Sequence, residues 1–209
     1  MTIIAQDPGV LDPRGRPGKR ILRACINVPA EALQAGPWGY RVQVVDYDTT
    51  REREYRALAL DEKKDPYQQA SDAELLRDPR FHCLNAYALV MRTLARFEKA
   101  LGRRIGWGFF GHQINVVPHA FEEANAYYSP DDHALLFGYF HGRSQRTVFT
   151  SLSHDVVVHE TTHALLDGIR QRFMDPSSTD QAAFHEGYSD VVALLSGLSL
   201  PEVMRFVVA

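Results

Sequence analysis

Two histidines stand four residues apart in the stretch VVVHETTHALLDG, which covers residues 156–168. On an α-helix four residues advance by about 400°, so His159 and His163 would project from one face, one turn apart. Two imidazole nitrogens placed in this way can share one zinc ion at about 2 Å. Glu160 would lie about 100° round the helix from His159, beside the ion without being aimed at it. A general base for an attacking water needs that position.

The same two histidines would also fit a buried helix in which each imidazole is hydrogen-bonded and no metal is bound. A third ligand decides between these interpretations, because a catalytic zinc takes three protein ligands and leaves its fourth position to water. The segment AAFHEGYSDVVALLSG (182–197) supplies Glu186, which comes 23 residues after His163. Asp190 follows four residues later on the same helical face, where it can accept the second N–H of a ligating imidazole. Two carboxylates on an otherwise apolar helix favour the zinc site over a purely structural core.

HETTHALLDG followed by HEGYSD resembles the thermolysin-like, or neutral, zinc metallopeptidase family. The pattern of that family is HExxH on one helix and Glu-x-x-x-Asp on the next, and the resemblance covers roughly residues 80–200. It implies an α+β fold with the architecture of a thermolysin-like N-terminal catalytic lobe. In such a lobe a mixed or antiparallel sheet accompanies a long helix, the HExxH helix and the helix of the third ligand.

The resemblance also implies roles for individual residues. ANAYY…ALLFG (124–138) is similar to the family's Asn-Ala-aromatic edge strand, whose backbone binds an extended peptide by strand addition. The implied assignments are Asn125 and Ala126 in the substrate groove, His159, His163 and Glu186 as ligands of one Zn²⁺, Glu160 as the base, Asp190 as the partner of His159, and Asp167 in a structural role.

The chain departs from the family outside the zinc ligands. Family members carry a histidine and an arginine in a helical C-terminal lobe, where they stabilise the oxyanion and hold the substrate backbone, and nothing after Asp190 supplies them. The Phe173-Met174 region replaces a family tyrosine, and His185 stands where asparagine is usual. Asp155 matches a calcium ligand of the family, but the downstream partner position falls at Gly197, so the pattern does not support a Ca²⁺ site.

Other histidines are weaker candidates for the missing oxyanion donor. They fall in expected loops or strands, and the one in the HGRSQR segment is the first to test: His112, His119, His133 and His141. His154 precedes His159 by five residues, which is about 140° round a helix, so it cannot share the metal.

The elements that must position these residues follow from hydrophobic periodicity and turn signals. The polar stretch 62–75 is expected to be a surface loop. A helix should begin after Asp78, which is a good N-cap followed by proline, and end at Gly102. A DTT turn predicts a hairpin between the second and third strands, and a Ser-Pro-Asp-Asp turn predicts an antiparallel pair between the last two. The expected strands are residues 21–28, 40–48, 53–60, 114–118, 125–128 and 134–140, and the expected helices are residues 78–102, 153–173 and 179–197.

Composition is ordinary for a globular protein, with 209 residues, 45% hydrophobic, 23% charged and a net charge of −3. This balance gives no reason to expect nucleic acid or a membrane as a partner. The family resemblance implies a peptide or protein substrate. Cys25 and Cys83 have no neighbouring cysteine, which excludes a CxxC metal or redox site. The N-terminal sequence has no apolar signal region and no long apolar run follows, so the expected location is cytoplasmic, with secretion as the alternative.

Residues 1–20 are expected to form a flexible N-terminal arm, since residues 5–20 are rich in Pro, Gly, Arg and Asp. Residues 21–209 are expected to form one metallopeptidase-like catalytic domain. The apolar end LPEVMRFVVA predicts a last helix packed inward or a surface covered by a missing C-terminal lobe or an oligomer, of which the missing lobe is favoured. The leading functional hypothesis is a zinc metalloendopeptidase. The alternatives are a non-catalytic zinc-containing binding or scaffold protein and an amidase for small substrates.

Overall fold

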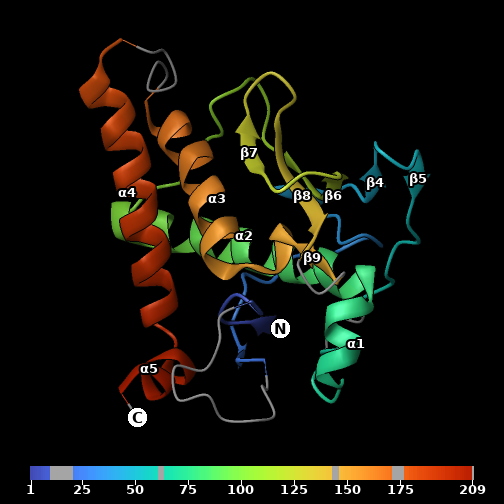
Figure 1. The fold of residues 1–209 in the computed structure, drawn as a ribbon. Coiled ribbons are helices and arrows are strands. Elements are labelled where there is room, and N and C mark those ends of the chain that lie inside the picture. The colour runs from blue at the N-terminus through green and yellow to red at the C-terminus, as the bar shows by residue number, and fades with distance from the viewer. Residues whose placement is uncertain (10–20, 61–63, 143–145, 171–176, 209) are drawn as a thin grey trace.

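The computed structural model describes residues 1–9, 21–60, 64–142, 146–170 and 177–208 (Figure 1). The predicted α+β class is confirmed. Helices α3 and α4 run side by side next to the sheet, and α2 crosses behind both (Figure 1). In chain order the elements are β1 (Thr2–Ile4), β2 (Arg23–Cys25), β3 (Val42–Val44), β4 (Tyr47–Asp48), β5 (Arg53–Glu54), α1 (Asp72–Arg77), α2 (Pro79–Leu101), β6 (Ile114–Phe121), β7 (Ala126–Ser129), β8 (Ala134–His141), β9 (Thr147–Phe149), the 3₁₀ turn η1 (Thr150–Leu152), α3 (His154–Ile169), α4 (Thr179–Leu198) and α5 (Pro201–Val208).

The central sheet is mixed, as expected, with the strand order β3-β6-β8-β7 and with β9 paired to β8 off this path. β3, β6 and β8 run parallel to one another, whereas β7 and β9 are antiparallel to β8. The predicted antiparallel pair across the Ser-Pro-Asp-Asp turn is therefore confirmed. Among the described strands β7 pairs only with β8, so its other edge is free and lies toward α3.

The long helix predicted from Asp78 to Gly102 is confirmed as α2. Its N-cap side chain accepts the backbone N–H of Arg80, and Pro79 occupies the first turn. Gly102 ends the helix with φ = 66°, a left-handed conformation that glycine adopts without steric cost. Every residue from Phe81 to Met91 is buried, because α2 packs against the sheet, β1 and α3.

The C-terminal end of α3 packs tightly on the loop that follows α2. A side-chain carbon at Gly168 would lie 1.9 Å from the carbonyl oxygen of Gly106, so only glycine permits this backbone approach. Gly108 is in the same situation, since its missing side chain leaves room for the carboxylate of Asp167. The core residues Val157, Ala164 and Leu165 hold the same helix against α2 and the sheet. α3 is thus held along its length.

Two sequence expectations are wrong. The surface loop expected for residues 62–75 gives way at its end to α1, because Ser71 and Glu74 form a reciprocal capping box and Leu75 is fully buried. The flexible arm expected for residues 1–20 does not begin at the N-terminus, because β1 is buried and pairs with β2. Its apolar Ile3 and Ile4 belong to the core. Residues 10–20 of the expected arm lie outside the described residues.

The other expected elements are present, but the strands expected over residues 53–60 and 21–28 are much shorter, as β5 and β2. The segment 40–48 is divided between β3, which joins the central sheet, and β4, which forms the predicted hairpin with β5. The last apolar segment is helix α5, which buries Val203 and leaves Val207 and Val208 exposed. Among the described residues no single helix is long and apolar enough to cross a membrane, and only α4 and α5 taken together, bent by 88°, match such a span in length and composition.

Candidate metal centre

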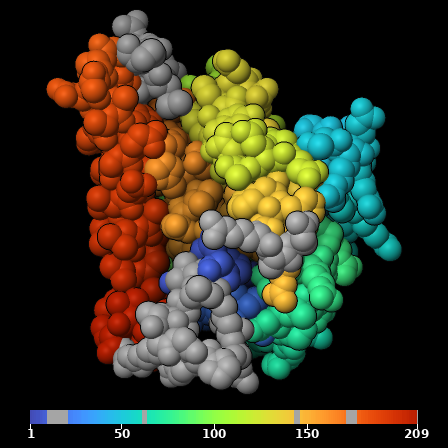
Figure 2. All heavy atoms as spheres, in the orientation of Figure 1, coloured from blue at the N-terminus to red at the C-terminus, as the bar shows by residue number. Residues whose placement is uncertain are grey.

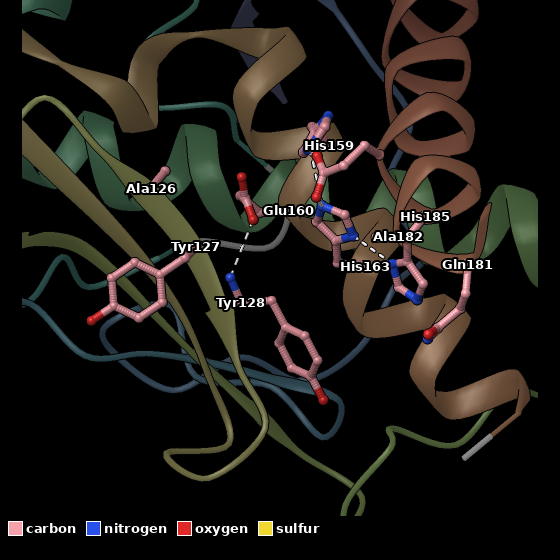
Figure 3. Close-up of a pocket in the computed structure, with 10 residues that line it drawn as sticks. Ala126, Tyr127, Tyr128, His159, Glu160, His163, Gln181, Ala182 and His185 are labelled. Carbon is pink, nitrogen blue, oxygen red and sulfur yellow. Dashed lines mark hydrogen bonds and ion pairs between the residues drawn. The ribbon is translucent and has the colours of Figure 1, made fainter. Parts of the chain in front are cut away.

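Three side chains from α3 and α4 converge with their metal-binding atoms inward (Figure 3). The Nε2 atoms of His159 and His163 lie 3.0 Å apart. The Glu186 carboxylate reaches them from α4, with Oε2 3.3 Å from His159 Nε2 and Oε1 3.6 Å from His163 Nε2. The sequence predicted these three residues as ligands, and the structure brings them together.

The donor spacing suits a zinc ion. With bonds of 2.0–2.1 Å in tetrahedral geometry, two zinc ligands stand about 3.3 Å apart. The three donor pairs here span 3.0–3.6 Å and bracket that value. Two imidazoles and one carboxylate are also a common ligand set for catalytic zinc. His159, His163 and Glu186 therefore fit the ion that the sequence predicts.

Both imidazoles use their outer nitrogen for a hydrogen bond within the protein. His159 Nδ1 lies 2.9 Å from Asp190 Oδ1 and donates to it, since an ionised carboxylate only accepts. His163 Nδ1 lies 2.7 Å from Nδ1 of His185, whose ring stacks on it at an interplanar angle of 14°. The Asp190 contact places the proton of His159 on Nδ1 and leaves the lone pair of its Nε2 for a metal. For His163, a metal on Nε2 requires that Nδ1 carry the proton and donate it to His185. Asp190 therefore makes the contact with His159 that was expected of it from the sequence.

Glu160 lies beside the ligands without joining them. Its Oε2 atom accepts the backbone N–H of Tyr128 at 3.1 Å, across from α3 to β7 (Figure 3). The pKa of Glu160 is raised to about 8, chiefly by burial. The Tyr128 hydrogen bond acts in the opposite direction, and the nearby charge of Glu186 adds to the rise. A buried carboxyl group with a pKa near neutrality can both accept and return a proton.

Two cavities flank the candidate centre. One, of about 370 Å³, extends along Tyr127 and Tyr128 toward the start of α4. The other, of about 640 Å³, extends past Asn125 toward the far half of α4. They share Ala126, His159 and Glu160, so the space continues on both sides of the metal ligands. Figure 2 shows the same region as a hollow between the sheet and α4.

The free edge of β7 forms one wall of this space. Tyr128 turns its N–H away from β8 and toward Glu160, and strand alternation turns the backbone of Ala126 the same way. The N–H of Ala126 is occupied by the Asn125 side chain at 2.9 Å. The C=O of Ala126 therefore points into the groove. Asn125 and Ala126, the predicted substrate-binding residues, lie along the cavities.

Sequence reasoning missed Tyr128. Its hydroxyl donates to Asp167 Oδ2 at 2.8 Å, so this residue connects the edge strand to α3 at two points. Asp167 is buried, in keeping with the structural role that the resemblance implies. The available signal was the position of Tyr128 in the ANAYY segment, three residues after Asn125.

The other histidines lie away from the two cavities. His141, the first candidate for an oxyanion donor, is 3.5 Å from Glu122, and His119 is buried against Asp46 at 2.5 Å. His112 stacks on Tyr40, His133 on Phe109, and His154 faces Ser196. None of the four candidate oxyanion donors therefore lines the cavities at the metal ligands. Phe173 and Met174 lie outside the described residues.

Comparison with known proteins gives a distant likeness to a solved structure. No family model matches the sequence, and no curated protein matches it. Among solved structures the chain is similar to the precursor of protealysin, a metalloproteinase from Serratia proteamaculans, at 17% sequence identity and a TM-score of 0.49. The match covers 83% of this chain and 46% of the protealysin precursor. The chain therefore spans about half the length of that protein. A likeness this distant carries no argument about activity, which rests on the residues of the site.

Proposed function

We propose that this chain is the catalytic part of a zinc-dependent metallopeptidase that hydrolyses internal peptide bonds. One observation carries the proposal. Three donors of the His-His-Glu type stand at zinc spacing, with an unligated, buried carboxyl group beside them and a free strand edge opposite. Water attack assisted by a carboxylate needs all three features.

The chemistry divides between the ion and the protein. A zinc ion held by His159, His163 and Glu186 supplies Lewis acidity, which polarises the scissile carbonyl and makes water acidic enough to attack near neutral pH. Glu160 takes the proton of the attacking water and returns it to the leaving amine, so no covalent intermediate forms. The Tyr128 N–H holds the Glu160 carboxylate in place for this transfer.

The groove favours an extended chain as the substrate. A peptide added to the free edge of β7 would donate a backbone N–H to the Ala126 carbonyl. Because cavities lie on both sides of Glu160, such a peptide has space to continue in both directions from the cleavage point. This arrangement favours cleavage within a chain over an amidase, whose small substrate needs a closed pocket.

Replacing Glu160 by Gln tests the mechanism. Zinc binding should persist, because Glu160 is not a ligand, while hydrolysis of an unfolded protein such as casein should fall by about 10²–10⁴-fold. Zinc content by mass spectrometry and peptide release would be measured together. Glu54→Gln, an equal change on the exposed strand β5, is the matched control. Undiminished hydrolysis by the Glu160 variant would rule out this mechanism.

One observation favours a second candidate, a zinc-containing module that holds peptides without cutting them. No arginine or lysine is among the described residues that line the two cavities. Those residues therefore provide no cationic side chain to stabilise an oxyanion. A zinc-loaded wild-type chain that binds unfolded protein but releases no peptide would support this candidate.

The surface of α4 and α5 bears on the same choice. Several apolar side chains are exposed there: Val191, Leu194, Leu195, Met204, Val207 and Val208. Coverage of this surface by a further lobe or a second subunit stays a prediction. Either partner could supply the missing oxyanion group, and the whole protein's activity depends on it under this proposal.

A further inference from the structure

A second cluster of charged side chains lies away from the metal ligands, on the face of α2 that meets the α4–α5 corner. Arg92, Arg96 and Lys99 follow one another at helical spacing and share one face. They line a cavity of about 520 Å³ whose other walls come from β2 with the residues after it and from the start of α5. This cavity shares no residue with the two at the metal centre.

The two guanidinium groups are held close together. Nη2 of Arg96 donates to Ser199 Oγ at 2.7 Å, and Nη2 of Arg92 donates to the same oxygen at 3.3 Å. The two Nη2 atoms are therefore no more than 6.0 Å apart, the sum of these distances. The Ser199 hydroxyl itself donates to the Ser196 carbonyl at 2.6 Å, so its hydrogen-bonding capacity is full.

Among the described residues no carboxylate forms an ion pair with either guanidinium, because no acidic oxygen lies within 4.0 Å of it. Glu202 acts on Arg92 only as a more distant opposite charge. Glu202 lines the same cavity, but its closest basic partner is Arg205 at 3.9 Å. Nε of Arg92 is buried without any hydrogen-bond partner. A buried donor on a charged group is costly to leave unpaired, so the cluster lacks an acceptor.

Burial acts on the same two arginines. It lowers the pKa of Arg96, and it lowers the pKa of Arg92 together with the adjacent Arg96 charge. A bland explanation is that the pair stabilises the C-terminal end of α4. However, both guanidiniums reach that end only through the neutral Ser199 hydroxyl, and neither donates to a helix carbonyl. This explanation leaves most of their N–H donors unused.

We propose that the cavity bounded by Arg92, Arg96 and Lys99 binds the phosphate group of a small phosphorylated molecule. A phosphate dianion offers several acceptor oxygens to two adjacent guanidinium forks, which a single carboxylate matches less well in charge. The cavity exceeds the size of one phosphate, and its remainder extends toward Cys25 and Asn27. The bound molecule therefore carries an organic part as well as the anion. This inference does not depend on the proposed peptidase activity.

Calorimetric titration of the zinc-loaded full chain tests the site. The probes are inorganic phosphate, glycerol 3-phosphate and acetate, at an ionic strength matched with sodium chloride. Arg92→Met and Arg96→Met should each weaken phosphate binding at least tenfold, because each removes charged hydrogen bonds. Arg103→Gln removes an equal charge just beyond α2, outside the cavity, and is the matched control. Glu202→Gln keeps the arginines and should tighten binding by removing a repelling carboxylate.

The outcomes separate the alternatives. Tighter binding of glycerol 3-phosphate than of inorganic phosphate would support a phosphorylated molecule as the ligand, and equal binding would point to free phosphate at the same site. Phosphate that binds no better than acetate would overturn the proposal. So would phosphate binding that survives both arginine substitutions, since the anion would then sit elsewhere, for example on the zinc. In that case the arginines stabilise only the end of α4.

Discussion

Replacing His185 by Leu should weaken zinc binding although His185 is not a ligand in the proposed centre. His163 can use Nε2 for the metal only if its proton sits on Nδ1, and that proton is accepted by His185 Nδ1 at 2.7 Å. The other nearby acceptor, Ser189 Oγ, is 3.4 Å from the same nitrogen. The His185→Leu variant would keep only that weak contact as the main restraint on the imidazole.

The expected loss follows from this geometry. Removing the acceptor that orients a ligating imidazole typically weakens metal binding by about 10–100-fold. This corresponds to about 1.4–2.7 kcal/mol of binding free energy. The loss should not reach the level expected for removing a ligand, because all three donor atoms remain. His185→Gln keeps a side-chain acceptor and should recover part of the affinity.

Competition with a chromophoric chelator at fixed pH gives the zinc dissociation constants of the wild type and both variants. Urea unfolding of the metal-free proteins serves as the control, because a purely structural effect would appear there in full. A Leu variant that binds zinc within threefold of the wild type would refute the reasoning. A Gln variant as weak as the Leu variant would show that ring stacking, and not the hydrogen bond, positions His163.

Two further predictions concern stability. Tyr128→Phe leaves the buried carboxylate of Asp167 without its 2.8 Å hydrogen-bond donor and should lower the free energy of unfolding by about 1–3 kcal/mol. The melting temperature should then fall by about 2–12 °C. Tyr127→Phe, which changes an exposed side chain, is the control and should have little effect. Burial, together with the charge of His119, lowers the pKa of His82 to about 3, so the folded chain keeps His82 neutral. As pH falls from about 6.5 toward 3 the unfolded chain gains this proton first, and stability should fall by up to about 5 kcal/mol. His82→Gln should flatten this acid dependence in urea unfolding, and parallel curves for the two proteins would contradict the assignment.

The sequence was sufficient to predict the features that depend on the geometry of one helix alone. The spacing of His159 and His163 fixes their common face before any tertiary structure is known, and Glu186 and Asp190 obey the same rule. The ends of α2 were equally readable, because Asp78 and Gly102 act through local backbone geometry. Convergence of the two helices required the resemblance to a known pattern, since spacing within one helix carries no information about its neighbour.

Contacts between different helices and strands could not be predicted from the sequence in this way. The parallel pairing of β3, β6 and β8 joins segments that are far apart in the chain. The capping box of α1 was local and visible in the sequence, but the polar composition around it concealed the buried Leu75. The His163–His185 and Tyr128–Asp167 contacts depend on how α3 lies against α4 and β7. A hydrogen bond across such an interface leaves no periodic pattern in the sequence from which it could be predicted.

The two helices hold the proposed ligands with unequal firmness. α3 is fixed by the core and by its glycine contact with the loop that follows α2, and His163 and Glu160 are nearly enclosed. α4 carries Glu186 and Asp190, whose side chains are 65% and 74% exposed, on a helix that packs mainly against α3 and α5. A zinc ion would therefore link a well-packed helix to a less constrained one, and part of its binding energy would go into holding α4 in place. It follows that a partner bound to the apolar side of α4 should also raise the affinity for zinc, because that contact would restrain the same helix.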